Sequence, residues 1–127
     1  MVKNTWEPIM KENKLVEISK QFAVDVVVIC ADIKENTKNN VLINQLLRSG
    51  ASIGANVHEA NYAASRADFV NKLQIALKEC YETEYWLDLF KTTSIMSAKD
   101  YEMLIAKCNK IRILLISSIK TAKDAMQ

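Results

Sequence analysis

A row of polar side chains has the spacing that normally marks a buried helix face. Its members follow one another at intervals of four, three, four and three residues: Gln45, Ser49, Ser52, Asn56 and Glu59. A buried polar group without a partner costs about 1–3 kcal/mol. The row therefore either forms a hydrogen-bonded network between helices or subunits, or lines a cavity that holds water or a ligand. The structural network is favoured, because helical bundles often fix their register with polar core positions.

Arg48 lies beside this row, and three carboxylates further along the chain are its candidate partners. Glu79, Glu82 and Glu84 fall within one helical pattern, and paired carboxylates can perform acid–base catalysis. No nucleophile or phosphate-binding loop accompanies them, so we expect no catalytic residue. Instead, Glu79 or Glu82 is predicted to pair with Arg48 across the bundle. The residues expected to be buried and mutually hydrogen-bonded are Arg48, Asn56, Glu59 and Glu79.

Gly50 and Gly54 lie four residues apart in the same predicted helix. Each glycine inside a helix costs about 1 kcal/mol relative to alanine. What glycine provides in return is room for another backbone, so the pair predicts the close approach of a neighbouring helix. A phosphate-binding loop is disfavoured, because the glycines do not follow a strand.

A metal site built on histidine is excluded. His58 is the only histidine, and an HExxH motif would need a second one where Tyr62 stands. A di-iron site of the ferritin type needs a histidine on each of two helices. We therefore expect an exposed or capping His58, no metal and no cofactor.

The three cysteines, Cys30, Cys80 and Cys108, all fall within apolar helical pattern and form no CxxC pair. Their odd number and wide spacing argue against a disulfide framework and against a zinc site, and fit a reducing cytoplasm. No stretch reaches about 18 consecutive apolar residues, so no membrane-spanning helix is expected.

The last helical segment carries an excess of basic residues: Lys107, Lys110, Arg112, Lys120 and Lys123. A solvated face is the favoured interpretation of this stripe, and contact with nucleic-acid phosphates is the alternative. Ile113, Leu114 and Ile116 add apolar surface beyond one bundle seam. In the first helical segment, Val24, Val27 and Val28 do the same. This surplus predicts oligomerisation.

The elements that position these residues follow from composition and periodicity. Two glycines and one proline among 127 residues are too few for the turns of a β-sandwich, a barrel or a doubly wound fold. A net charge of +2 does not demand nucleic acid as a partner. We predict a single all-α domain over residues 1–127, an up-down-up-down four-helix bundle, with a loose arm at residues 1–13. The predicted helices cover residues 14–34, 41–61, 66–92 and 98–124.

The run from Gln45 to Ala60 resembles the signature of the four-helix-bundle proteins named for intervening sequences in the bacterial 23S rRNA gene. That signature reads Q-x-x-R-S-x-x-S-I-x-x-N-I-x-E-(G or A), and the match continues through Asp68-Phe69 to Leu87. The resemblance implies a ring-like homopentamer without enzymatic activity. A related branch, the accessory protein of diversity-generating retroelements, is a basic pentamer that binds nucleic acid and a reverse transcriptase.

Two hypotheses follow. The first is a non-enzymatic, cytoplasmic homo-oligomer that acts as a scaffold or adaptor, with a protein or with RNA or DNA as its partner and no membrane. Nucleic acid would be held weakly and without sequence preference by the basic stripe. The second hypothesis is a small-ligand or catalytic site along the polar row, acting through Glu59 and Glu79.

Overall fold

The computed structural model describes residues 14–126, and within this range the chain forms α-helices and no strand. The helices are α2 (Leu15–Asn36), α3 (Asn40–Ala60), α4 (Arg66–Thr92) and α5 (Ala98–Asp124). Every boundary lies within two residues of its predicted position. The predicted N-terminal arm, residues 1–13, lies outside the described residues.

The starts of α4 and α5 are set by serine caps. Ser65 Oγ accepts a hydrogen bond from the backbone N–H of Asp68 at 3.0 Å, and Ser97 Oγ accepts one from Asp100 at 3.1 Å. The carboxylate of Asp68 in turn accepts a hydrogen bond from the backbone N–H of Ala64, the residue before the cap, at 3.1 Å. Such caps contribute about 1 kcal/mol each, and they fix where each helix begins.

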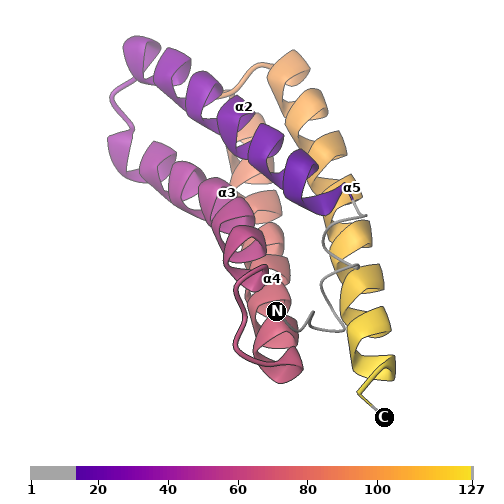
Figure 1. Cartoon of the computed structure of the whole chain (residues 1–127). Helices are drawn as coiled ribbons and strands as arrows, with labels where there is room; N and C mark the ends of the chain where they lie inside the picture. Colours follow the sequence, from indigo (N-terminus) through magenta and orange to yellow (C-terminus); the bar gives the residue numbers. More distant parts are fainter. Residues whose placement is uncertain (1–13, 127) are drawn as a thin grey trace.

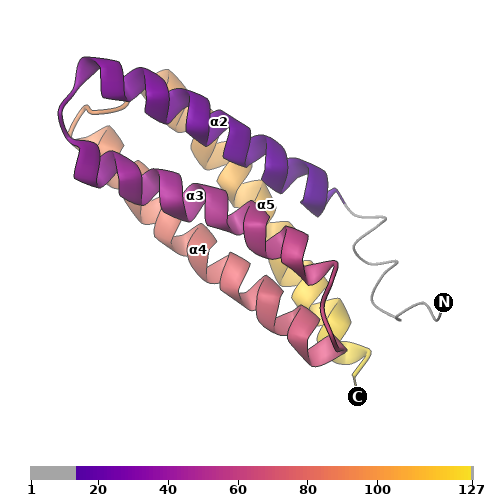
Figure 2. The same ribbon diagram turned by 60° about the vertical axis from the view of Figure 1, so that its left-hand side comes forward.

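Consecutive helices lie side by side and are joined by short connections, while α2 also contacts α5 (Figures 1 and 2). The α2–α5 side is the least extensive of these four contacts. No helix within residues 14–126 is long and apolar enough to cross a bilayer.

The core lies between the four helices and is built from large side chains that solvent does not reach, including Phe22, Phe69 and Phe90. Helix α2 approaches α3 closely at the two glycines. A Cβ atom at Gly50 would lie 3.1 Å from both methyl groups of Val26, and one at Gly54 would lie 3.1 Å from the carbonyl oxygen of Ser19. The predicted close approach of a neighbouring helix is therefore confirmed, and the neighbour is α2.

Candidate functional site

Arg48 on α3 reaches across to two carboxylates on α4. Its Nη1 lies 3.2 Å from Glu79 Oε2, and its Nη2 contacts Glu82. The indole N–H of Trp86 donates to the same Glu82 oxygen at 3.1 Å. The predicted pairing of Arg48 with these glutamates is therefore present. The prediction that Arg48 is buried is wrong, because 48% of its side chain is exposed, so solvent screens the pair.

Beneath this ion pair, two hydroxyl groups meet in the core. Thr83 Oγ1 lies 3.0 Å from Ser49 Oγ and 2.8 Å from the carbonyl oxygen of Glu79. Ser49 Oγ in turn lies 3.3 Å from the carbonyl oxygen of Leu46. Both side chains are buried, so these contacts satisfy groups that would otherwise be costly to bury. The sequence identified Ser49 as a network member and missed Thr83, because Thr83 shares its helical spacing with the apolar residues Cys80 and Leu87.

The rest of the polar row does not join this network. Asn56 Nδ2 donates to the carbonyl oxygen of Ser52 at 2.9 Å, within its own helix. Glu59 is exposed and lies 3.6 Å from Lys72 Nζ. The predicted mutual bonding of Asn56 and Glu59 with Arg48 is therefore wrong. The physical reason is that Leu46, Ile53 and Val57 occupy the face of α3 that packs in the core and are fully buried along its length. The polar row lies beside this apolar face, so Ser49 reaches the core whereas Glu59 is exposed.

His58 is exposed, as predicted, with its ring 5.5 Å from that of Tyr62. It borders a shallow groove of about 360 Å³ between α2 and α3. The lining of this groove is small and apolar apart from His58 and Lys20: Val16, Ala23, Ala51, Gly54 and Ala55.

The basic stripe of α5 divides into two parts. Lys107 pairs with Asp25 on α2, and Arg112 Nε lies 3.0 Å from Glu84 Oε1 on α4. Lys110, Lys120 and Lys123 are exposed, which leaves three of the five predicted basic residues displayed without a described ion pair. Lys120 and Lys123 border a cavity of about 450 Å³ that Leu77, Ile116 and Ile119 also line.

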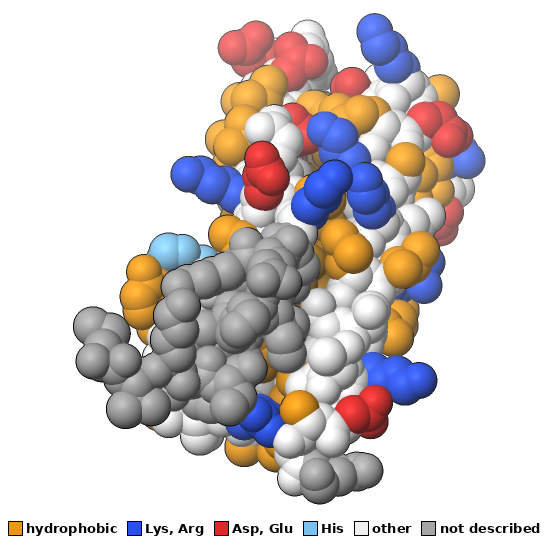
Figure 3. Space-filling view, turned by 45° about the vertical axis from the view of Figure 1, so that its right-hand side comes forward, with side chains coloured by type: hydrophobic (Ala, Val, Ile, Leu, Met, Phe, Trp, Pro, Cys, Tyr) orange, Lys and Arg blue, Asp and Glu red, His pale blue; other side chains and the backbone are white. Residues whose placement is uncertain are grey.

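Hydrophobic side chains reach the surface between charged ones (Figure 3). On α2, Val24, Val27 and Val28 are exposed, and Val28 retains 61% of its accessible surface. On α5, Ile113 and Ile116 are exposed. The predicted apolar surplus on these two helices is therefore present in the fold of the single chain.

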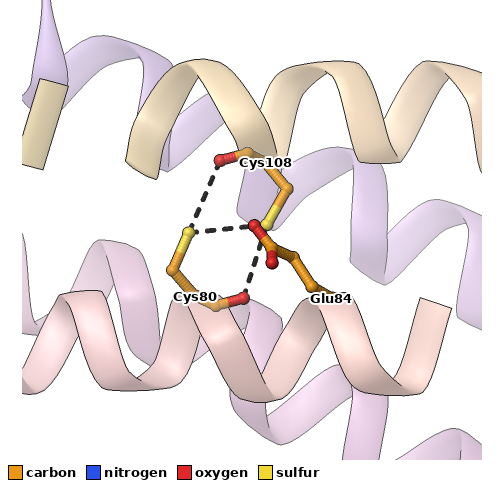
Figure 4. A group of neighbouring side chains, drawn as sticks. All are labelled: Cys80, Glu84 and Cys108. Carbon is orange, nitrogen blue, oxygen red and sulfur yellow. Dashed lines mark hydrogen bonds between the residues drawn. The ribbon is translucent and has the colours of Figure 1, made fainter. Parts of the chain in front are cut away.

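The structure brings together two cysteines that the sequence separates by 28 residues. Cys80 on α4 and Cys108 on α5 place their sulfur atoms 3.4 Å apart in the core (Figure 4). The hydrogen bond with Cys80, together with burial, holds the pKa of the Cys108 thiol far above its ordinary range. Burial also raises the pKa of Cys30 to about 11, although Lys34 opposes this shift. No spacing motif in the sequence signalled the pair.

Comparison with known proteins places this geometry in context. The model of the family described as 23S rRNA-intervening sequence protein matches residues 11–117. A similar solved structure is the crystal structure of a protein with unknown function from the S23 ribosomal protein family of Bacteroides thetaiotaomicron. It shares 47% sequence identity and a TM-score of 0.83, over 87% of this chain and 98% of that chain. No curated protein matches the chain.

Proposed function

Because the chain belongs to the family of 23S rRNA-intervening sequence proteins, we propose that it is a non-enzymatic assembly protein. In this proposal the helices run up-down-up-down, and the bundle forms a cytoplasmic homo-oligomer, a pentamer by resemblance to the family. The oligomer serves as a scaffold or adaptor that presents several copies of one surface.

The observation that carries the proposal is the row of exposed valines on α2. Three of five consecutive residues are exposed valines, although the same helix buries Phe22, Val26 and Ile29 on its other side. Water contact with this apolar surface is unfavourable by about 25 cal/mol per Å². A second copy of the chain can remove it from water, so α2 is the proposed contact surface.

A substitution in this surface tests the proposal. Val27→Lys places a charge at the centre of the valine row, and we expect sedimentation velocity to show smaller species than for the unchanged protein. Val41→Lys is the matched control, because Val41 is 76% exposed in the first turn of α3, away from the row. Equal sedimentation of both variants and the unchanged protein would contradict the role of α2.

Weak, sequence-independent binding of nucleic acid is the adaptor activity that we propose for α5. Lys110, Lys120 and Lys123 support it, since their ammonium groups are displayed, whereas Lys107 and Arg112 contact carboxylates. Repetition of a small basic surface around an oligomer raises the effective concentration of phosphate contacts. Affinity should then fall steeply with salt, because bound phosphates release counterions.

Fluorescence anisotropy with single-stranded RNA and duplex DNA at two salt concentrations tests this activity. We expect replacement of the three displayed lysines by glutamine to abolish binding at low salt. The control replaces Lys34, Lys38 and Lys99, which are also exposed, and removes the same charge. Absence of binding by the unchanged protein, or binding that the replacement of the three α5 lysines leaves unaffected, would leave a protein as the partner. Equal loss in both variants would contradict the role of α5.

The alternative of a ligand or catalytic site along the polar row has less support. Glu59 and Glu79 do not converge, since Glu59 lies next to Lys72 and Glu79 next to Arg48. The buried hydroxyls of Ser49 and Thr83 contact one another and backbone carbonyls. These contacts favour a structural role for the row.

A further inference from the structure

Two thiols and one carboxylate converge between α4 and α5. Cys80 and Cys108 are both inaccessible to solvent, and each sulfur lies within 3.6 Å of the other residue's carbonyl oxygen. Glu84 follows Cys80 by one helical turn, which brings its carboxylate to the same point. One ligand atom from each of the three residues lies within 4.8 Å of the other two (Figure 4).

We propose that Cys80, Cys108 and Glu84 bind a thiophilic divalent cation of the Zn²⁺ class. Thiolate and carboxylate are both ligands that Zn²⁺ accepts, at about 2.3 Å and about 2.0–2.2 Å respectively. Tetrahedral coordination at these lengths puts two sulfur atoms about 3.8 Å apart. The sulfur atoms are 3.4 Å apart in this structure, so they need to separate by only a few tenths of an ångström.

The charges around the cluster also suit a divalent ion. Two thiolates and one carboxylate carry three negative charges. Arg112, whose Nε lies 3.0 Å from Glu84 Oε1, supplies one positive charge, and the cation supplies the other two. The resulting group is neutral, which matters because an uncompensated charge is costly in a core. Binding releases the two thiol protons to solvent and involves no change of oxidation state.

The cluster has a route to solvent. Glu84 and Arg112 are half-buried, with 25% and 31% of their side chains exposed, whereas the two cysteines lie behind them. A cation therefore enters along the carboxylate, and a water molecule from the same side completes a four-coordinate shell. Arg112 holds the carboxylate in place, as outer partners of metal ligands commonly do.

A disulfide between Cys80 and Cys108 is the competing use of the two thiols. It requires the sulfur atoms to approach from 3.4 Å to about 2.05 Å, and it requires an oxidant to reach the core. It gives no role to Glu84 or Arg112, whereas the cation uses all four groups. The disulfide is therefore an outcome that the experiment must detect.

Titration with Co²⁺ tests the proposal on the whole 127-residue chain after reduction and removal of metal by a chelator. We expect a thiolate-to-cobalt charge-transfer band and visible d–d bands of four-coordinate intensity, which saturate at one ion per chain. Added Zn²⁺ should displace the cobalt and remove the bands. The absence of these bands at saturating Co²⁺ would overturn the proposal.

Single substitutions assign the ligands. Cys80→Ser and Cys108→Ser should each abolish the charge-transfer band or weaken Co²⁺ binding at least tenfold, and Glu84→Gln should weaken it about tenfold. Cys30→Ser is the matched control, because Cys30 is also a buried cysteine but lies against the carbonyl of Ile43 on α3. Circular dichroism checks folding, and the alanine variant at the same position replaces any serine variant that fails to fold.

Three results would contradict the assignment. The first is Co²⁺ binding that survives in the Cys80 and Cys108 variants, and the second is binding that is lost equally in Cys30→Ser. The third is a Cys80–Cys108 disulfide found by mass spectrometry in a protein that, once reduced, binds no Co²⁺. This third result would identify a redox pair in place of a cation site.

Discussion

Gly54→Ala measures how closely α2 and α3 approach, because two opposing effects decide the sign of its effect on stability. Alanine is favoured over glycine inside a helix by about 1 kcal/mol. The new methyl group, however, would lie 3.1 Å from the carbonyl oxygen of Ser19 and 3.4 Å from its carbonyl carbon. Both atoms belong to the backbone of α2, so no rotation of a side chain relieves the contact.

Overpacking in a filled core costs about 1–3 kcal/mol. The packing cost therefore exceeds the gain in helix propensity, and we expect the free energy of unfolding to fall by about 1 kcal/mol. Urea denaturation followed by circular dichroism, at fixed protein concentration because the protein is expected to be oligomeric, measures this change.

Gly50→Ala provides the comparison within the same helix. Its new methyl group meets the two methyl groups of Val26 at 3.1 Å, and these belong to a side chain that can be shortened. Val26→Ala should therefore cost less in the Gly50→Ala background than in the unchanged protein. The same Val26 substitution should not rescue Gly54→Ala. An increase in stability of about 1 kcal/mol for Gly54→Ala alone would refute the close approach at that position.

Three further predictions concern the polar groups and the thiols. Arg48→Met should lower the free energy of unfolding by only about 1 kcal/mol, because Arg48 is half-exposed and solvent screens its ion pairs. Urea denaturation measures this change, and a loss of about 3–5 kcal/mol would instead indicate a buried pair. A double-mutant cycle of Ser49→Ala and Thr83→Val should give a coupling energy of about 0.5–1.5 kcal/mol, which is the usual net value of one hydrogen bond. A coupling energy of zero would contradict the contact between the two hydroxyl groups. Burial raises the pKa of Cys30 from 9.0 to about 11, so the folded chain holds this proton more tightly than the unfolded chain. The stability contributed by Cys30 is complete below pH 9 and is lost as the pH rises toward 11. Urea denaturation across this range should show a smaller loss in Cys30→Ala than in the unchanged protein, and identical losses would refute the assignment.

The helix boundaries could be predicted because the signals that set them are local. Ser65 and Ser97 each cap a helix by accepting a hydrogen bond from the backbone N–H three residues later. The apolar periodicity that follows each cap extends over many turns. The sequence also predicted that some helix would approach Gly50 and Gly54 closely, although not that it would be α2. Two glycines within one helix lower its stability, and the room that they leave for a neighbouring backbone accounts for their presence.

Apart from the pairing of Arg48 with Glu79 and Glu82, contacts that depend on the register between helices could not be predicted. The sequence places Lys107 and Arg112 in a basic stripe, but the register of α5 against α2 and α4 brings them to Asp25 and Glu84. For the same reason Cys80 and Cys108 gave no signal, since their meeting depends on how far α5 lies along α4. One sequence contains no observation that fixes such offsets.

The most direct test of the proposed assembly is the mass of the protein in solution. Size-exclusion chromatography with multi-angle light scattering, at micromolar concentration and near-physiological salt, measures it without assumptions about shape. A homopentamer of the 14.4 kDa chain predicts a mass of about 72 kDa, and another closed ring would give a different whole multiple. A mass of 14.4 kDa would contradict the assembly and would leave the exposed valines of α2 without the partner proposed for them.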